Sequence, residues 1–416
     1  MKFVRGLGAF ALVALFAGAG FFTRDLLAMA PPDMAALNRL VDPKAAKAPT
    51  PTELFQTHFN LIAADYVRPI ERDDLRWAAM SGLVDSLGDP HTNFLPPRES
   101  ESFSTETRGD YVGIGARLSE DPAGARIVTV FQGSPAQVAG VKADDLIIKV
   151  DGTDATGMAV DKIVDRIQGK PETRVRLTVV RSGAPDPVEI VITRRRIEIP
   201  TVERKTLDGN IAYIRVTNFA QPTTVQFREA VNAVAPNAAG MIIDMRGNPG
   251  GLLDTAVNML GVFVENKTVV EVRTRGGWEQ SARSPLGAIM PVPKRIVVLI
   301  DGEAASASEI FAGVLRDYKL ATLVGEHTYG KMTVQNLLQL PEGASVKVTI
   351  GKYYIPSKED INRKVDEDGT YVSGGLHPDI NVELPKDRAV TIGDVTKGDT
   401  QLAKAIDVIR GRAAKP

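Results

Sequence analysis

Apolar residues recur along the chain with different spacings, and each spacing predicts a different kind of structure. From Thr52 to Leu87 they recur every three or four residues, in the stripes of amphipathic helices. From Gly109 to Arg196, short β-rich segments predict strands at Tyr111–Leu118, Arg126–Phe131, Leu146–Val150 and Arg174–Arg181, and a helix at Ala159–Gln168. We therefore expect a helical segment over residues 53–108 and a small, partly open β-barrel with a helix over residues 109–196.

From about Ile197 onward, apolar strands alternate with amphipathic helices. The predicted strands are Ile211–Val216, Met241–Met245, Ile296–Ile300, Thr322–Val324, Leu337–Leu340 and Ser345–Tyr354. The predicted helices are Val225–Val234, Leu252–Val264, Ser308–Tyr318 and residues 398–410. This alternation predicts an α/β domain with a largely parallel sheet over residues 197–385, followed by a C-terminal helical tail over residues 386–416. The fold class is multidomain α/β.

The first 30 residues have the pattern of an export signal. Lys2 and Arg5 precede an uncharged run over residues 6–22, and Ala28-Met29-Ala30 fits a cleavage site. We expect a cleavable signal peptide, with an uncleaved membrane anchor as the alternative. Residues 31–52, rich in proline and alanine, are predicted to be a linker. The protein is therefore expected to be exported, to the periplasm or the cell envelope.

Composition excludes several classes of function. Lys and Arg number 50 against 51 for Asp and Glu, so the net charge of −1 gives no reason to expect nucleic-acid binding. The 416 residues contain no cysteine, which excludes disulfides, thiolate metal sites and a cysteine nucleophile. The four histidines are far apart, so we do not expect a His-rich metal site.

Three loops that follow predicted strands carry the candidate chemistry, because ligands of open α/β sheets bind beyond the carboxyl ends of the strands. Asp244–Gly251 is rich in glycine, which favours either a ligand-binding loop or an ordinary turn. Ser306 stands before a predicted helix, and Glu309 three residues later also fits a simple capping box. Lys331 lies between apolar strands, where partial burial would lower its pKa, although a surface lysine fits the same pattern.

Together these loops resemble the carboxy-terminal processing proteases, which are tail-specific peptidases with a Ser–Lys pair. The resemblance rests on Ser306–Phe311, on Gly330-Lys331 with Val334-Gln335, and on Asp244–Gly251. The family places its lysine 25 residues after its serine, as in this chain. It extends to Asp89-Pro90-His91 in the helical segment, to Gly375-Leu376-His377-Pro378-Asp379, and to a PDZ domain over residues 109–196. The α/β domain is then expected to be a crotonase-like serine protease core.

The resemblance implies a role for each matching residue. Ser306 would be the nucleophile, Lys331 its general base, and Gln335 the residue that orients Lys331. The backbone N–H groups of Ala307 and Gly250 would form the oxyanion hole. Ser308 is the competing nucleophile, which the match to the family disfavours.

In the PDZ domain, Gly113, Ile114 and Gly115 would bind the carboxylate of a substrate's C-terminus. The implied partners are polypeptides with free, apolar C-termini, and the resemblance also leaves room for an adaptor protein, a homo-oligomer and membrane association through the N-terminus. No metal or cofactor is implied.

Some positions depart from the family pattern, and other functions stay open. Met332 replaces the usual glycine after the lysine, Asp144 a common glycine in the PDZ turn, and Lys358-Glu359-Asp360 the usual small residues.

The main alternative is a catalytically silent PDZ protein of the cell envelope that binds peptides. An HtrA-like protease is disfavoured because Pro249 occupies its serine slot, and a crotonase-type acyl enzyme is disfavoured by the PDZ domain.

Overall fold

The structure is a computed structural model that describes residues 49–277, 279–385 and 389–412. The predicted signal peptide and most of the linker lie outside these residues. The chain divides into two units, residues 1–79 and 80–416. The first contains helix α3 (Pro51–Asp65), which begins with a capping box between Thr50 and Glu53 and buries none of its side chains. Helix α4 (Arg72–Asp85) crosses the division. In the described part of the chain, no helix is long and apolar enough to cross a membrane.

Within the second unit, residues 110–198 form the predicted β domain. Its main sheet has the order β3-β4-β5-β7-β8, with β6 paired to β5. The bounds are β3 Ala116–Asp121, β4 Gly124–Val130, β5 Leu146–Val150, β6 Thr153–Asp154, β7 Arg174–Val180 and β8 Val188–Thr193. Helices α6 (Pro135–Val138) and α7 (Val160–Ile167) and the paired strands β2 (Asp110–Gly113) and β9 (Arg195–Glu198) complete it. The single strand expected at Tyr111–Leu118 is therefore two strands, broken at Ile114 and Gly115.

The α/β domain is built on a six-stranded sheet with the order β10-β11-β12-β15-β16-β21. Every neighbouring pair is parallel except β10 with β11, which confirms the predicted parallel sheet. The bounds are β10 Val202–Leu207, β11 Ile211–Val216, β12 Gly240–Asp244, β15 Ile296–Ile300, β16 Thr322–Gly325 and β21 Ile380–Asn381. Strands β12 and β15 are buried along their whole length, as expected of central parallel strands.

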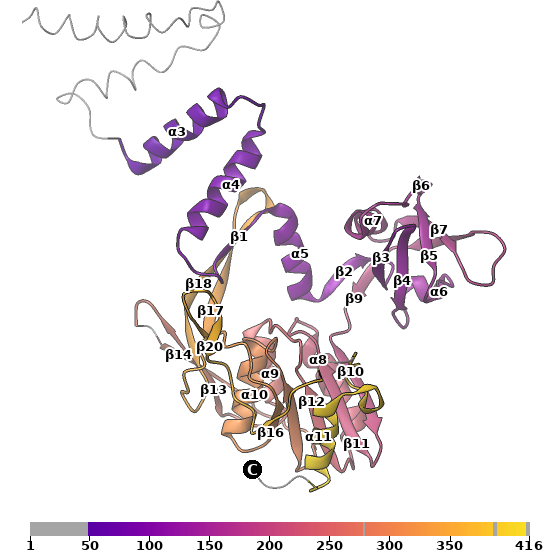
Figure 1. Cartoon of the computed structure of the whole chain (residues 1–416), viewed down its shortest axis with the longest axis vertical. Helices are drawn as coiled ribbons and strands as arrows, with labels where there is room; N and C mark the ends of the chain where they lie inside the picture. Colours follow the sequence, from indigo (N-terminus) through magenta and orange to yellow (C-terminus); the bar gives the residue numbers. More distant parts are fainter. Residues whose placement is uncertain (1–48, 278, 386–388, 413–416) are drawn as a thin grey trace, which may run out of the picture. The chain divides into compact units, whose positions relative to one another are not determined.

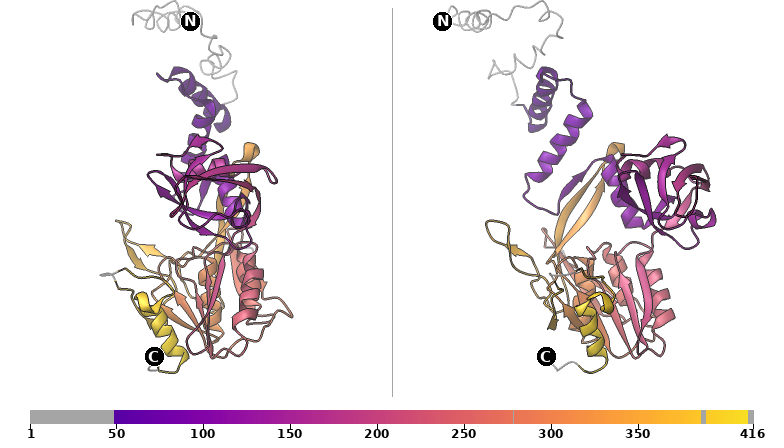
Figure 2. Two further views of the ribbon diagram at one scale, coloured as in Figure 1. Left: turned by 90° about the vertical axis from the view of Figure 1, so that its right-hand side faces the viewer. Right: turned by 45° about the vertical axis from the view of Figure 1, so that its right-hand side comes forward.

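Helices cover both faces of this sheet, because successive side chains of a strand point to opposite faces. On one face, Ile214, Ile243 and Val298 pack in a core that includes helices α8 (Thr223–Val234), α9 (Leu253–Leu260) and α10 (Ala307–Asp317). On the other, Ile242 and Val297 pack with Leu402, Ala405 and Ile409 of helix α11 (Thr400–Ile409). Figures 1 and 2 show α11, in yellow, lying along the sheet.

A second, antiparallel sheet contains strands from both ends of this unit. Its order is β1-β18-β13-β14, with β17 paired to β18. The bounds are β1 Asn93–Leu95, β13 Thr268–Thr274, β14 Glu279–Arg283, β17 Thr333–Gln339 and β18 Ser345–Tyr354. Strand β1 follows Asp89-Pro90-His91 and is itself followed by helix α5 (Pro97–Arg108). The pairing of β1 with β18 places this short strand, which lies within the predicted helical segment, in the sheet that carries Gln335.

Candidate active site

The three candidate loops meet at the carboxyl edge of the parallel sheet, as the sequence predicted. They follow β12, β15 and β16. The Ala305 N–H donates to the carbonyl of Asn248 at 3.1 Å, and the Tyr329 N–H donates to the carbonyl of Ala304 at 2.9 Å. The carboxylate of Asp301 accepts the Gly247 N–H, with both oxygens at 3.0 Å. Hydrogen bonds thus join the middle loop to both of the others.

Ser306 occupies a sharp turn between β15 and α10. Its backbone has φ 56° and ψ −113°, a conformation that a non-glycine residue adopts at a cost of about 1–3 kcal/mol. The serine is partly exposed, whereas its neighbours Ala305 and Ala307 are buried. Its N–H donates to the Glu309 carboxylate at 2.8 Å. The reciprocal contact, from the Glu309 N–H to the Ser306 hydroxyl, has the arrangement of a capping box without the geometry of a standard hydrogen bond. The structure thus places Ser306 in the capping-box arrangement that its sequence spacing allowed, at a strained and partly exposed turn.

Glu309 is the functional residue whose role the sequence analysis missed. Its fully buried carboxylate accepts four hydrogen bonds, from the N–H groups of Ser306 (2.8 Å), Lys331 (2.9 Å) and Gly330 (2.7 Å) and from the hydroxyl of Thr328 (2.5 Å). Burial raises the pKa of Glu309, and these donors oppose that shift. One carboxylate oxygen binds the backbone of both Ser306 and Lys331, so Glu309 clamps the two candidate dyad residues together.

Lys331 lies in a half-buried position, as its apolar flanks predicted. Burial lowers the pKa of its amine, and the positive charge of Lys347 lowers it further, whereas Glu309 and Asp89 act in the opposite direction. Both leading causes favour the neutral amine that a general base requires. Met332, which replaces a glycine of the family pattern, is buried in the hydrophobic core, and its carbonyl accepts the Tyr353 N–H at 2.9 Å.

Gln335 lies on β17, next to a register shift in its pairing with β18. Its side-chain NH₂ donates to the hydroxyls of Thr333 at 2.7 Å and Thr349 at 3.2 Å. These bonds orient the amide group and leave its carbonyl oxygen as the acceptor. Among the described residues, no hydrogen bond joins that oxygen to the Lys331 amine.

The loop at Asp89-Pro90-His91 adjoins the lysine loop, which sequence reasoning did not predict. The His91 ring lies edge-on to Tyr329, with ring centroids 6.3 Å apart. Thr92 accepts the Thr349 N–H at 3.0 Å and donates to Asp89 at 2.6 Å. Because Thr349 also accepts from Gln335, this chain of hydrogen bonds connects the end of the helical segment with the candidate site. The only available sign was the resemblance of this motif to the family.

The loop over residues 246–251, which we call the glycine loop, lies directly against Ser306. A Cβ atom on Gly250 would be 2.9 Å from both the Ser306 Cβ and the Ala307 nitrogen, and φ at Gly250 is +99°. Only glycine fits so close an approach. The Gly250 N–H donates to the side-chain oxygen of Asn248 at 2.9 Å, so as an oxyanion donor it would have to give up that bond. Within the described structure, the Ala307 N–H has no hydrogen-bond acceptor.

Ser308, the competing nucleophile, is fully buried. Its hydroxyl donates to the carbonyl of Asn248 at 2.9 Å. This bond ties the start of α10 to the glycine loop. Because Ser308 is buried, a substrate cannot reach its hydroxyl.

In the β domain, Gly113, Ile114 and Gly115 form the turn between β2 and β3. The carbonyls of Ile114 and Gly115 accept the N–H groups of Ala136 (2.8 Å) and Phe131 (2.9 Å). A Cβ atom on Gly113 would lie 2.6 Å from the ring of Tyr111, whose hydroxyl interacts with the N–H groups of Gly115 and Ala116. Burial raises the pKa of Tyr111, and these N–H groups oppose that shift. Backbone hydrogen bonds therefore fix the carbonyls of this turn.

Comparison with protein families defines the class of protein. The model of peptidase family S41 matches residues 210–382, and the PDZ domain model matches residues 103–180. The chain therefore combines a serine-type peptidase core with a PDZ domain.

Individual relatives narrow this class further. The chain is 33% identical over 329 residues to the carboxy-terminal processing protease CtpA of Bacillus subtilis (strain 168), covering 79% of this chain and 68% of CtpA. It is 32% identical over 343 residues to a CtpA-like serine protease of Staphylococcus aureus (strain COL), covering 82% of this chain and 66% of that protein. Among solved structures, the photosystem II D1 C-terminal processing protease is 28% identical, with a TM-score of 0.44, over 81% of this chain and 89% of that one. The chain belongs to the carboxy-terminal processing proteases.

Proposed function

We propose that this protein is an exported serine endopeptidase that cleaves polypeptides near their C-termini, with Ser306 and Lys331 as its catalytic dyad. The observation that carries the proposal is the Glu309 clamp, because one oxygen atom accepts hydrogen bonds from the backbone of both residues. The exposure of Ser306, its strained backbone and the lowered pKa of Lys331 support the same assignment.

In the proposed mechanism, the neutral amine of Lys331 takes the proton of the Ser306 hydroxyl as its oxygen attacks the scissile carbonyl. The N–H of Ala307 stabilises the negative charge on the carbonyl oxygen, with Gly250 as second donor once it releases Asn248. The Lys331 ammonium then protonates the leaving amine, which produces an acyl-enzyme. Water activated by Lys331 hydrolyses this ester and restores Ser306. Gln335 is assigned the role of positioning Lys331; its side-chain carbonyl would have to approach the amine, because no hydrogen bond joins the two groups in the described structure.

Substrate selection is assigned to the PDZ domain, where residues 113–115 bind the terminal carboxylate and the peptide adds as a strand. The fixed carbonyls of this turn support this assignment. Binding there also raises the local concentration of the substrate at the dyad.

The dyad is tested with Lys331→Met in the full chain, using an unfolded protein with an apolar C-terminus as substrate. We expect cleavage by the wild type to persist in a metal chelator, and the variant to lose it while its circular dichroism stays unchanged. Cleavage by Lys331→Met at the wild-type rate would exclude Lys331 as the base. Loss of cleavage in the chelator would point to a metal-dependent mechanism.

Recognition of the C-terminus is tested with two forms of one peptide, which end in a free carboxylate or an amide. The proposal predicts a lower KM for the carboxylate form and cleavage of both. Equal KM values would remove the role assigned to residues 113–115. A wild-type protein that binds the peptide without cleaving it would instead be a silent PDZ protein.

A further inference from the structure

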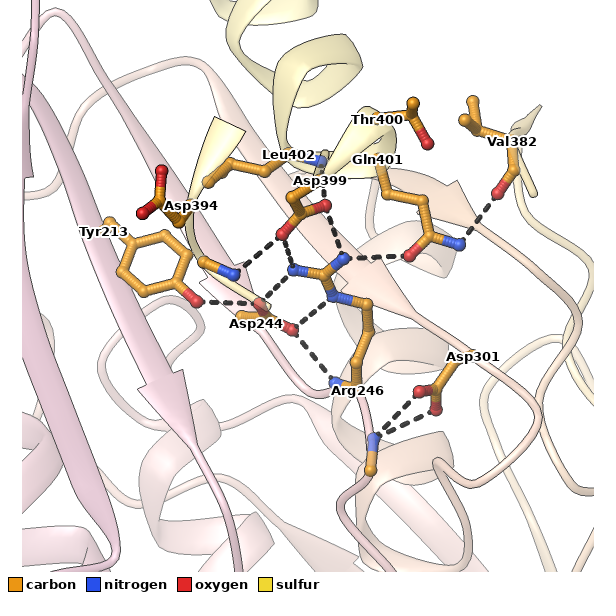
Figure 3. A network of polar contacts seen from close by, with 12 residues as sticks. Tyr213, Asp244, Arg246, Asp301, Val382, Asp394, Asp399, Thr400, Gln401 and Leu402 are labelled. Carbon is orange, nitrogen blue, oxygen red and sulfur yellow. Dashed lines mark hydrogen bonds and ion pairs between the residues drawn. The ribbon is translucent and has the colours of Figure 1, made fainter. Parts of the chain in front are cut away.

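Arg246, the first residue of the glycine loop, has a buried side chain that uses all of its donors. Its Nε and Nη2 donate to the two oxygens of Asp244, at 2.9 and 2.6 Å. On its other side, Nη1 and Nη2 donate to the two oxygens of Asp399, both at 2.8 Å, and Nη1 also donates to Gln401 at 2.9 Å. Figure 3 shows the guanidinium between the two carboxylates. Since a guanidinium has five N–H donors, each has an acceptor.

Asp399 belongs to the C-terminal segment, 153 positions further along the chain. It caps helix α11 by accepting the Leu402 N–H at 2.9 Å, and it accepts the Gly393 N–H at 2.7 Å. Its position is therefore set by backbone that packs against the sheet. Burial acts against the charge of Asp399, but the hydrogen bonds and charge of Arg246 lower its pKa.

The Arg246 side chain fixes the start of a loop whose glycines are conformationally free. Gly247, Gly250 and Gly251 have φ values of 68°, 99° and 140°. Glycine reaches these conformations freely, but it also leaves them freely. Arg246 begins the loop, and Gly250 lies against Ser306 only four residues later. A displacement of Arg246 would therefore also displace Gly250, which lies against Ser306.

Stability alone is a weak explanation for these buried charges. Apolar side chains of similar volume often stabilise a core as well as a buried ion pair does. A planar guanidinium that binds one carboxylate on each side also fixes the distance and orientation of Asp244 relative to Asp399.

We propose that Asp399 is a positioning residue for the proposed peptidase, which holds the glycine loop in register with Ser306 through Arg246. This inference rests on the proposed function and gives the C-terminal segment a part in it. Asp399 does not touch substrate, so its effect is on the geometry of the oxyanion hole.

The test is Asp399→Asn in the full chain. Asparagine is as good a helix cap as aspartate, so α11 keeps its N-terminal cap, while the charge and one of the two acceptors for Arg246 are lost. The matched control is Asp394→Asn. Asp394 caps a neighbouring 3₁₀ turn through the Thr396 N–H at 3.0 Å, and it pairs with the exposed Lys397 rather than with Arg246.

Two readouts separate positioning from a purely structural role. The first is kcat and KM for a peptide substrate. The second is the affinity of a peptide aldehyde, whose adduct with Ser306 places an oxyanion among the same donors, compared with an uncleavable peptide of the same sequence. For Asp399→Asn we expect kcat to fall about 10- to 100-fold with KM within about twofold, and the aldehyde alone to bind more weakly by a similar factor.

Unchanged kcat and aldehyde affinity in a folded Asp399→Asn variant would overturn the inference, as would equal weakening of both ligands. If this variant does not fold, Asp399→Glu keeps the charge and displaces it by one methylene, and the same selective loss is required of it. The wild type and Ser306→Ala are measured alongside. Absence of cleavage by the wild type counts against the proposed function, whereas equal kcat for wild type and Asp399→Asn counts against this inference alone.

Discussion

Replacing Glu309 by glutamine should disconnect the nucleophile from its base with little change in shape. A glutamine side chain offers one acceptor oxygen, and its NH₂ group faces donors that it cannot satisfy. Ser306 and Lys331 share one carboxylate oxygen, and Thr328 and Gly330 share the other. With its NH₂ group toward Ser306 and Lys331, the glutamine leaves both of their N–H groups without an acceptor. In the other orientation it leaves the N–H of Gly330 without one, while the Thr328 hydroxyl can turn and accept from the NH₂ group.

The size of the effect follows from these lost bonds. Each unsatisfied donor costs about 1–3 kcal/mol, so one or two of them cost about 1–6 kcal/mol. Part of this is recovered because the neutral amide is easier to bury than a carboxylate. If about 2–3 kcal/mol remains and opens the clamp, kcat/KM falls about 30- to 160-fold.

The assay is kcat/KM for a peptide substrate, with folding followed by circular dichroism. Glu303→Gln is the matched control, because Glu303 is exposed on the same loop before Ser306. It should keep wild-type activity. A folded Glu309→Gln variant with kcat/KM within about threefold of the wild type would refute the clamp.

Three further predictions concern the same site. Because Lys331 must be neutral, kcat/KM should rise with pH through its lowered pKa. Lys347→Met removes a positive charge that lowers this pKa, so the rising limb should move to higher pH. The exposed Lys352→Met on the same strand is the control, and an unmoved limb in Lys347→Met would contradict this account. Gly250→Ala places a methyl group 2.9 Å from the Ser306 Cβ, at a φ of +99° that alanine rarely adopts. Cleavage should therefore fall at least about 100-fold in a peptide assay. Cleavage at the wild-type rate would show that the loop does not approach the nucleophile. Ser308→Ala should lose about 1 kcal/mol of stability in a denaturant titration and keep its cleavage, whereas loss of cleavage in the folded variant would reopen Ser308 as nucleophile.

The central strands could be predicted from the sequence because they are short, fully buried apolar runs. Ile211–Val216 and Ile296–Ile300 have the predicted bounds. So does Ser345–Tyr354 of the second sheet, a longer and partly exposed strand in which apolar and polar residues alternate. The strands Thr268–Thr274 and Glu279–Arg283 were missed, since the second is polar and mostly exposed and gives no apolar pattern. Helix α9 ends at Leu260, four residues before the apolar pattern does, because the chain turns there while its apolar residues stay buried.

Spacing and resemblance indicated the candidate dyad, but they did not predict the side-chain hydrogen bonds around it. Glu309 fits a local capping box in the sequence, and its bonds to Gly330 and Lys331 span more than twenty residues. The hydrogen bond from Arg246 to Asp399 joins residues that are still further apart in sequence, by 153 positions. Side-chain contacts of this kind depend on how the loops fold back over the sheet, which no local pattern encodes.

The most direct test of the central claim compares three proteins purified in the same way: the wild type, Ser306→Ala and Ser308→Ala. Each is incubated with an unfolded protein that has an apolar C-terminus, after circular dichroism has shown matched folding. The account predicts cleavage by the wild type and Ser308→Ala and none by Ser306→Ala. Cleavage by Ser306→Ala at the wild-type rate would contradict it and leave Ser306 as a helix cap.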